Sequence, residues 1–460
     1  MKIKEIFSKI KKNYTFGYSL VSIGLFMVVT TANLDMASHL LKWAETFFSP
    51  AHAALYTSVA VMIVGSICVY FQQVSLKMET LKNSATSNGS ANSHDLKVKD
   101  SNDNIGFLRI LPIEAKLVCI GMIILALAGP FDLAWHTAFG IDGLLSPSHA
   151  TFRIGEAIAG IGALWGIVSS SGVIKNKPRE KNHRTIEHNE LNNNTRKGYG
   201  NISYFATDSI PNTYGIIRPK NPHILYPLFI IIGVVAIWRT ATGFTSMVTL
   251  PFSNTINFQW NPDPHLAIML ASFFFPFFTS VMLYCSFRLG VHSVDNRSSD
   301  KNSKLDVRRY KFGILTFTAL AYMLITLTTS ILPNKFIVST IPWYLLSIIP
   351  ILAVDILLTF FYRCPNHNDT KNRKVKLISG AVLGLTFMTL YYPYVGLTYS
   401  ELLQPNEFPR AETLGLFYFS AMGEIFPWLV IPAVASGIFG IMIVSKNIPY
   451  ITPSKSALPI

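Results

Sequence analysis

Residues 132–149 read DLAWHTAFGIDGLLSPSH, and residues 35–52 read DMASHLLKWAETFFSPAH. In both stretches a His follows an Asp by four residues, a Ser-Pro pair begins ten residues after that His, and a second His stands thirteen residues after the first. The copies lie 97 residues apart and share Asp35/Asp132, Ala37/Ala134, His39/His136, Ser49/Ser146, Pro50/Pro147, His52/His149 and Ala53/Ala150. This repeated spacing predicts two equivalent structural units.

The chain around the two copies has the composition of a membrane protein. Half of its 460 residues are hydrophobic, only 14% are charged, and the mean hydropathy is positive. We therefore predict an all-α, polytopic integral membrane protein that contacts the lipid bilayer. About ten transmembrane helices are expected, because ten mostly apolar runs are long enough to cross a bilayer: 17–34, 53–72, 112–131, 150–171, 222–243, 265–287, 311–332, 340–362, 376–397 and 412–445. The last run is too long for one straight span and contains Pro427 and Pro432, so we expect a kink or a preceding interfacial segment.

The positions of Lys and Arg predict the orientation. These residues gather in the N-terminal segment and in the connections 73–110, 172–221, 288–311 and 363–376, whereas 132–149 and 244–264 have none and 35–52 has only Lys42. By the positive-inside rule, the N- and C-termini are cytoplasmic, and both motif copies lie near the extracytoplasmic face of the plasma membrane. The net charge of +14 then reflects topology, and we expect no nucleic-acid partner.

Two polar connections divide the chain. Residues 73–110 and 173–221 contain stretches rich in Asn, Ser, Lys and Asp that cannot bury enough apolar surface to fold. We expect 73–110 to be disordered in part and 173–221 to be a low-complexity cytoplasmic linker. The linker separates a membrane region at 1–172, with both motif hairpins, from a six-helix membrane region at 222–460.

Each motif copy is predicted to form the turn between two helices. Asp132 and His136 lie one helical turn apart and share a face. Ser146 is a good N-cap and Pro147 a good first helical residue, which places His149 in the opening turn of the next helix. The three side chains then converge across the mouth of the hairpin. A carboxylate and two imidazoles suit copper, with zinc or iron as alternatives, and leave positions open for water or substrate.

The repeat extends this prediction to Asp35, His39 and His52. The alternative is structural, because an Asp and a His near a membrane interface often hydrogen-bond to each other or to helix ends. Capping explains Ser-Pro in both copies, but it does not require an Asp and two His, so the duplication favours metal binding. We expect the second copy to bind more tightly, since Trp135 replaces Ser38 beside its first His and no cation such as Lys42 stands in its loop.

The second copy also carries a family resemblance, in Asp132, Trp135-His136, Asp142, Ser146-Pro147-Ser148-His149 and Phe152. These residues resemble the metal-binding stretch in the C subunit of particulate methane and ammonia monooxygenases. The resemblance implies that Asp132, His136 and His149 bind copper near the outer membrane face. It further implies a copper-dependent, monooxygenase-like oxidoreductase, or an accessory subunit of one, that acts with other membrane subunits. No convincing counterpart is seen to the further Asn and His ligands that the family carries on a later helix.

Several charged residues fall in or near apolar runs: Arg153, Glu156, Arg239, Asp355 and Glu424. Charge is costly there and is usually paired or lines a polar pathway. Arg153 and Glu156 are three residues apart on a predicted helix, so we expect them to pair.

Two other function classes stay open. A metal or small-solute transporter, with the hairpins as parallel halves around a path, is favoured by Asp355 and Glu424. The other is a structural membrane subunit whose motif residues only hydrogen-bond. No Walker A loop, dinucleotide fingerprint or nucleophile elbow occurs in the sequence.

Overall fold

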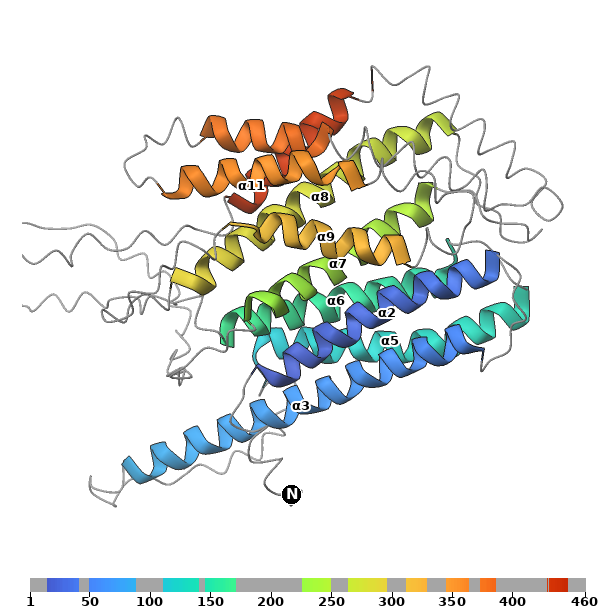
Figure 1. Cartoon of the computed structure of the whole chain (residues 1–460). Coiled ribbons are helices and arrows are strands. Elements are labelled where there is room, and N and C mark those ends of the chain that lie inside the picture. The colour runs from blue at the N-terminus through green and yellow to red at the C-terminus, as the bar shows by residue number, and fades with distance from the viewer. Residues whose placement is uncertain are drawn as a thin grey trace, which may run out of the picture.

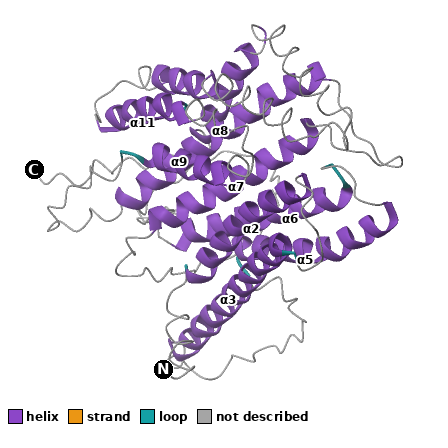
Figure 2. Cartoon of the chain, turned by 45° about the vertical axis from the view of Figure 1, so that its right-hand side comes forward, coloured by secondary structure: helices purple, strands orange, loops and turns teal. Residues whose placement is uncertain are grey.

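The regular structure of this protein is helical. The computed structural model describes residues 15–40, 49–87, 111–139, 145–170, 226–249, 264–295, 312–328, 345–363, 373–385, 428 and 430–445. Within these ranges there is no strand, as the colouring of Figure 2 shows. The predicted all-α class is therefore confirmed. The linker 173–221, most of 73–110 and Glu424 lie outside the described residues.

Every one of the ten predicted apolar runs overlaps a described helix. The helices are α2 (Phe16–Leu40), α3 (Pro50–Ser87), α5 (Ile113–Phe139), α6 (Pro147–Ser170), α7 (Tyr226–Thr249), α8 (Pro264–Asp295), α9 (Ile314–Thr326), α11 (Ile348–Arg363), residues 373–385 and Val430–Ser445. Six of them, α2, α3, α5, α6, α7 and α8, are long and apolar enough to cross a membrane. The chain is thus a multi-pass, membrane-type helical protein. Of the last run, 412–427 lies outside the described residues, and Pro432 falls in the first turn of the final helix.

The two motif copies form two helical hairpins, α2–α3 and α5–α6. Both pairs are antiparallel, and the helix ends next to their turns lie at the same end of the molecule, on the right in Figure 1. The expected common direction of the two copies is therefore observed. The far end of α3 projects beyond the other helices at the lower left of Figure 1.

Glycines let the two helices of each hairpin approach closely. A Cβ atom built on Gly121 of α5 would lie 2.4 Å from the backbone nitrogen of Ala159 on α6, and one on Gly24 of α2 would lie 2.9 Å from that of Met62 on α3. Gly24 and Gly121, like Met62 and Ala159, are separated by 97 residues. Small residues at helix contacts are the usual way to bring helices together in lipid, where the hydrophobic effect supplies little attraction between them.

A second glycine pair follows the same offset. A Cβ on Gly65 would lie 2.8 Å from the nitrogen of Val21, and a Cβ on Gly162 would lie 2.8 Å from that of Val118. Gly65 and Gly162, and Val21 and Val118, are again 97 residues apart. The repeat therefore extends from the motif turns into the packing of the hairpin stems.

Helix α7 joins the two parts of the core. Its Val234 and Ile237 belong to a buried cluster with α2, α3, α5 and α6, while its Val235 and Trp238 belong to a second cluster with α8, α9 and α11. Arg239 of α7 is also buried. Its guanidinium lies 5.6 Å from the ring centroid of Tyr322 on α9, which stacks on Trp238 with centroids 3.9 Å apart.

The buried Asp355 of α11 stabilises a helix end. Its carboxylate accepts hydrogen bonds from the backbone N–H and the hydroxyl of Thr316, at 3.1 and 2.9 Å, in the first turn of α9. A carboxylate at a helix N-terminus satisfies backbone donors and interacts favourably with the helix dipole. Asp355, which had no evident partner in the sequence, thus has a structural one.

Candidate metal centre

The local structure around the second motif copy follows the sequence prediction. Asp132 and His136 lie in the last two turns of α5, on one face. After the turn, α6 begins at Pro147, and the backbone N–H of His149 donates a hydrogen bond to the Ser146 hydroxyl at 3.1 Å. Ser146 is therefore the N-cap of α6, and His149 stands in its opening turn as predicted.

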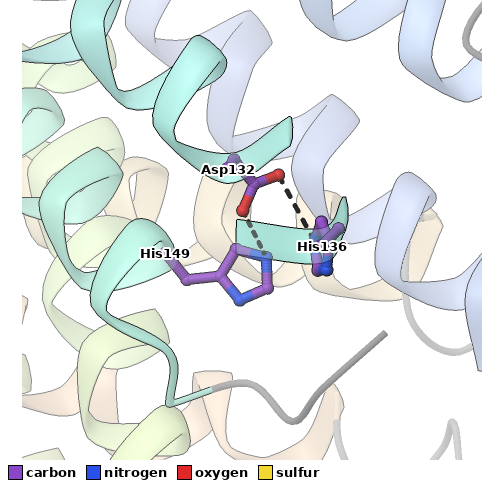
Figure 3. A group of neighbouring side chains, drawn as sticks. All are labelled: Asp132, His136 and His149. Atoms are coloured by element: carbon purple, nitrogen blue, oxygen red, sulfur yellow. Dashed lines mark ion pairs between the residues drawn. The ribbon is translucent and has the colours of Figure 1, made fainter. Parts of the chain in front are cut away.

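Asp132 lies between the two imidazoles, as Figure 3 shows. Its Oδ2 atom is 3.5 Å from Nε2 of His136, and its Oδ1 atom is 3.4 Å from Nε2 of His149. One donor atom from each of the three residues lies within 4.8 Å of the others. The three ligands proposed for the second hairpin are thus brought together by α5 and α6, and their side chains are 36%, 28% and 32% exposed.

The two separations between Asp132 and the imidazoles can be compared with those in hydrogen bonds and in metal sites. N–H···O hydrogen bonds in proteins cluster at about 2.9–3.0 Å, well below the distances between Asp132 and either imidazole. Two bonds of about 2.1 Å that meet at a roughly tetrahedral metal hold their donor atoms about 3.4 Å apart. The donor atoms therefore lie close enough together to share a metal ion, and His136 also hydrogen-bonds directly to Asp132.

A residue outside the predicted ligand set also contacts Asp132. The buried Ser148 donates a hydrogen bond from its hydroxyl to Asp132 Oδ1 at 2.6 Å, and its Oγ lies 3.0 Å from the Ser146 Oγ. In the sequence, Ser148 is distinguished from the first copy, which has Ala51 at the equivalent position and therefore no hydroxyl there.

The first hairpin brings two of its three predicted ligands together. His52 Nε2 lies 3.1 Å from Asp35 Oδ1, and the His52 ring stacks on Tyr56 one turn further along α3 with centroids 6.2 Å apart. His39 belongs to α2, but its side chain lies outside the described part of the structure, so the third ligand of this hairpin is not placed.

Trp135 lies beside the second site together with two other aromatic residues. It belongs to an aromatic row on α5 with Phe131 and Phe139, whose ring centroids lie 6.1 and 4.4 Å from its own. Phe131 and Phe139 are both exposed. Trp side chains concentrate where the hydrocarbon meets the headgroups, and Trp135 lies near the end of α5, a helix long enough to cross a membrane.

A buried ion pair lies on α6 close to the site. Arg153, one turn beyond His149, donates a hydrogen bond from Nη1 to Glu156 Oε2 at 2.8 Å, and Glu156 is completely buried. The predicted pairing of Arg153 and Glu156 is confirmed. The guanidinium also lies against α7, since a Cβ built on Gly243 would be 3.5 Å from Arg153 Cζ.

Comparison with known proteins adds no relative to this description. No protein-family model matches the chain, and no curated protein or solved structure is similar to it.

Proposed function

We propose that this chain is an integral membrane copper protein whose metal centre is formed by Asp132, His136 and His149. The observation that carries the proposal is the convergence of one carboxylate oxygen and two imidazole nitrogens within 4.8 Å at the mouth of the α5–α6 hairpin. Three protein ligands that are only partly buried leave coordination positions for water or another small molecule, which is typical of reactive rather than purely structural sites.

Copper is favoured by the ligands and by the resemblance of the motif. Imidazole nitrogens with a carboxylate oxygen suit Cu(II), and divalent copper binds such sites more strongly than divalent iron or zinc. Zinc and iron are the alternatives, since both accept the same ligand types. The resemblance to the C subunit of particulate methane and ammonia monooxygenases supports copper and suggests a role as a monooxygenase-like oxidoreductase or its accessory subunit, together with other membrane subunits.

A second and weaker centre is proposed at the first hairpin, with Asp35, His39 and His52 as ligands. The short contact between Asp35 and His52 supports it. The two hairpin turns lie at the same end of the molecule. We place that end at the extracytoplasmic face of the plasma membrane, because the cation-rich segments alternate with the motif turns along the chain.

The transporter alternative loses part of its support. It was favoured by the acidic residues Asp355 and Glu424 in the apolar runs. Asp355 accepts hydrogen bonds from the first turn of α9, and Arg153 pairs with Glu156. Asp355 therefore has a structural partner within the described part of the chain, and the support that remains for a transporter is Glu424, which lies outside the described residues.

Metal analysis of the purified protein tests the proposal. The full chain is purified from membranes in detergent, dialysed against a weak chelator, and analysed for copper, zinc and iron. We expect wild type to retain copper, and Asp132→Ala and His136→Ala to lose most of it, because a three-ligand site reduced to two ligands holds little metal. Thr137→Ala is the matched control, since the exposed Thr137 hydroxyl bonds only to the carbonyl of Leu133 one turn earlier. Wild type free of all three metals after growth with added copper would refute the proposal.

A further inference from the structure

The start of α6 contains a directed chain of hydrogen bonds that ends on Asp132. The Ser148 hydroxyl has one proton, which it donates to Asp132 Oδ1 at 2.6 Å. In its 3.0 Å contact with Ser146 Oγ, Ser148 must then be the acceptor and Ser146 the donor. Ser146 Oγ in turn accepts the backbone N–H of His149 at 3.1 Å. The chain therefore runs from His149 N–H through Ser146 and Ser148 to the carboxylate.

This chain restrains two of the three proposed ligands at once. It joins the backbone of His149 on α6 to the carboxylate of Asp132 on α5, across the mouth of the hairpin. Both serines are buried, at 1% and 0% exposed, so water does not compete for these bonds. Hydrogen bonds in a row polarise one another, and a bond to a carboxylate is stronger than one between neutral groups. The carboxylate is consequently held in one orientation, with Oδ2 toward His136.

The outgoing helix of the first hairpin lacks the middle member of this hydrogen-bond chain. Both outgoing helices begin with the same backbone hydrogen bond, from Ala53 N–H to the Ser49 carbonyl and from Ala150 N–H to the Ser146 carbonyl, each 2.9 Å long. Ala51 occupies the place of Ser148 and is likewise buried. Its methyl group cannot donate a hydrogen bond to Asp35.

We propose that Ser148 is a positioning residue of the metal centre, and that its hydroxyl contributes to tighter metal binding at the second hairpin than at the first. The inference rests on the function proposed above, because it concerns the same site. Groups that hydrogen-bond to metal ligands fix ligand orientation in advance, and their loss typically weakens metal binding about 10–100-fold. The Ser148 hydroxyl fixes the orientation of Asp132 in this way, and the first hairpin has no hydroxyl at the equivalent position.

A reciprocal exchange between the two hairpins tests the inference. Ser148→Ala gives the second hairpin the residue of the first, and Ala51→Ser does the reverse. The second site is measured alone in the Asp35→Ala background, and the first alone in the Asp132→Ala background. Dissociation constants for Cu(II) are obtained by competition with a chelator of known affinity, using the full-length protein in detergent. Thr151→Ala is the control, since the exposed Thr151 hydroxyl donates to the Pro147 carbonyl in the same opening turn of α6.

The expected results differ in sign between the two hairpins. Ser148→Ala should weaken Cu(II) binding at the second site by about 10–100-fold, and Ala51→Ser should strengthen it at the first site. Thr151→Ala should leave the second site unchanged. Electron paramagnetic resonance of Cu(II)-loaded Ser148→Ala should still show coupling to imidazole nitrogens, with altered g values, whereas a misfolded hairpin would lose that coupling.

Each of the three alternative results would reject a different claim. If wild type binds no Cu(II), the metal function fails and the inference fails with it. If wild type binds Cu(II) but Ser148→Ala binds equally well, the metal function stands and the positioning role is wrong. If Ser148→Ala loses the imidazole coupling, the result of Ala51→Ser decides, and no gain of affinity there overturns the inference.

Discussion

At the scale of single residues, the two motif copies have the same proposed ligands and differ in the residues around them. The two motif copies share the Asp, both His, and the Ser-Pro that starts the outgoing helix. They differ at Ser148, Trp135 and Arg153, where the first copy has Ala51, Ser38 and Tyr56. These differences surround the ligands and do not replace them, so they are expected to change affinity and not ligand identity.

His136→Ala should remove more metal than His39→Ala. His136 belongs to the centre in which all three proposed ligands lie together and Ser148 hydrogen-bonds to Asp132. In the first hairpin, Lys42 adds positive charge to the loop, which should weaken metal binding. Bound copper and zinc per chain are measured in each variant and in the double variant. A double variant with full metal content would leave only the structural interpretation of the repeat.

The Arg153–Glu156 pair should matter for stability. Glu156→Gln leaves the Arg153 guanidinium without its carboxylate partner in a largely buried position and should destabilise the fold by about 3–5 kcal/mol. Replacing both residues together, as in Arg153→Met with Glu156→Met, should recover much of that loss, because no unpaired charge remains. Thermal unfolding in detergent measures both effects. Equal melting temperatures for wild type and Glu156→Gln would show that the ion pair does not contribute.

At the scale of helices, the repeat is a property of the packing as well as of the motif. Gly24 and Gly121, which share the 97-residue offset, both face the opposite helix of their hairpin so closely that no side chain fits. This close contact brings α5 and α6 near enough for Ser148 to reach Asp132. The hairpin stem therefore supports the site at its mouth.

Two glycines of α5 provide a matched test of this packing. Gly121→Ala places a methyl group 2.4 Å from the backbone of α6 and should cost about 1–3 kcal/mol through overpacking, with weaker metal binding. Gly129→Ala, in the same helix, meets nothing within 4 Å and should be neutral or stabilising, since Ala favours helix by about 1 kcal/mol over Gly. Melting temperature and metal content are compared for both. Similar losses in the two variants would contradict the proposed role of close packing.

The elements differ in how far the sequence could predict them. Local rules predicted the shared face of Asp132 and His136 and the start of α6 at Pro147, because helix periodicity and capping depend only on neighbouring residues. The contact from Ser148 to Asp132 spans the hairpin and depends on the Gly121 packing. Asp355 and Thr316, 39 residues apart, meet only through tertiary packing, which no local spacing rule describes.

At the scale of the whole molecule, α7 connects the motif hairpins to the rest of the bundle. Its opposite faces belong to two different buried clusters, so the hairpins do not form an isolated unit among the described residues. The sequence predicted the ten helical positions, and among the described residues six of these helices are long and apolar enough to cross a membrane.

The orientation of the whole molecule can be tested by cysteine labelling. With Cys68, Cys119, Cys285 and Cys364 replaced by Ala, a cysteine at the exposed Ala138, near the motif turn, should react with a membrane-impermeant maleimide in intact cells. A cysteine at Ser84, at the end of α3 far from the motif turns, should react only after permeabilisation, because the positive-inside rule places that end in the cytoplasm. The reverse pattern would invert the proposed topology.

The central claim, that Asp132, His136 and His149 bind one metal ion, is tested most directly by electron paramagnetic resonance of the protein loaded with Cu(II) in the Asp35→Ala background. The spectrum should show hyperfine coupling to two imidazole nitrogens, because His136 and His149 each present Nε2 to the Asp132 carboxylate. His136→Ala and His149→Ala should each remove one nitrogen. A spectrum that both substitutions leave unchanged, or one of solvated copper in the parent protein, would contradict the proposed metal centre.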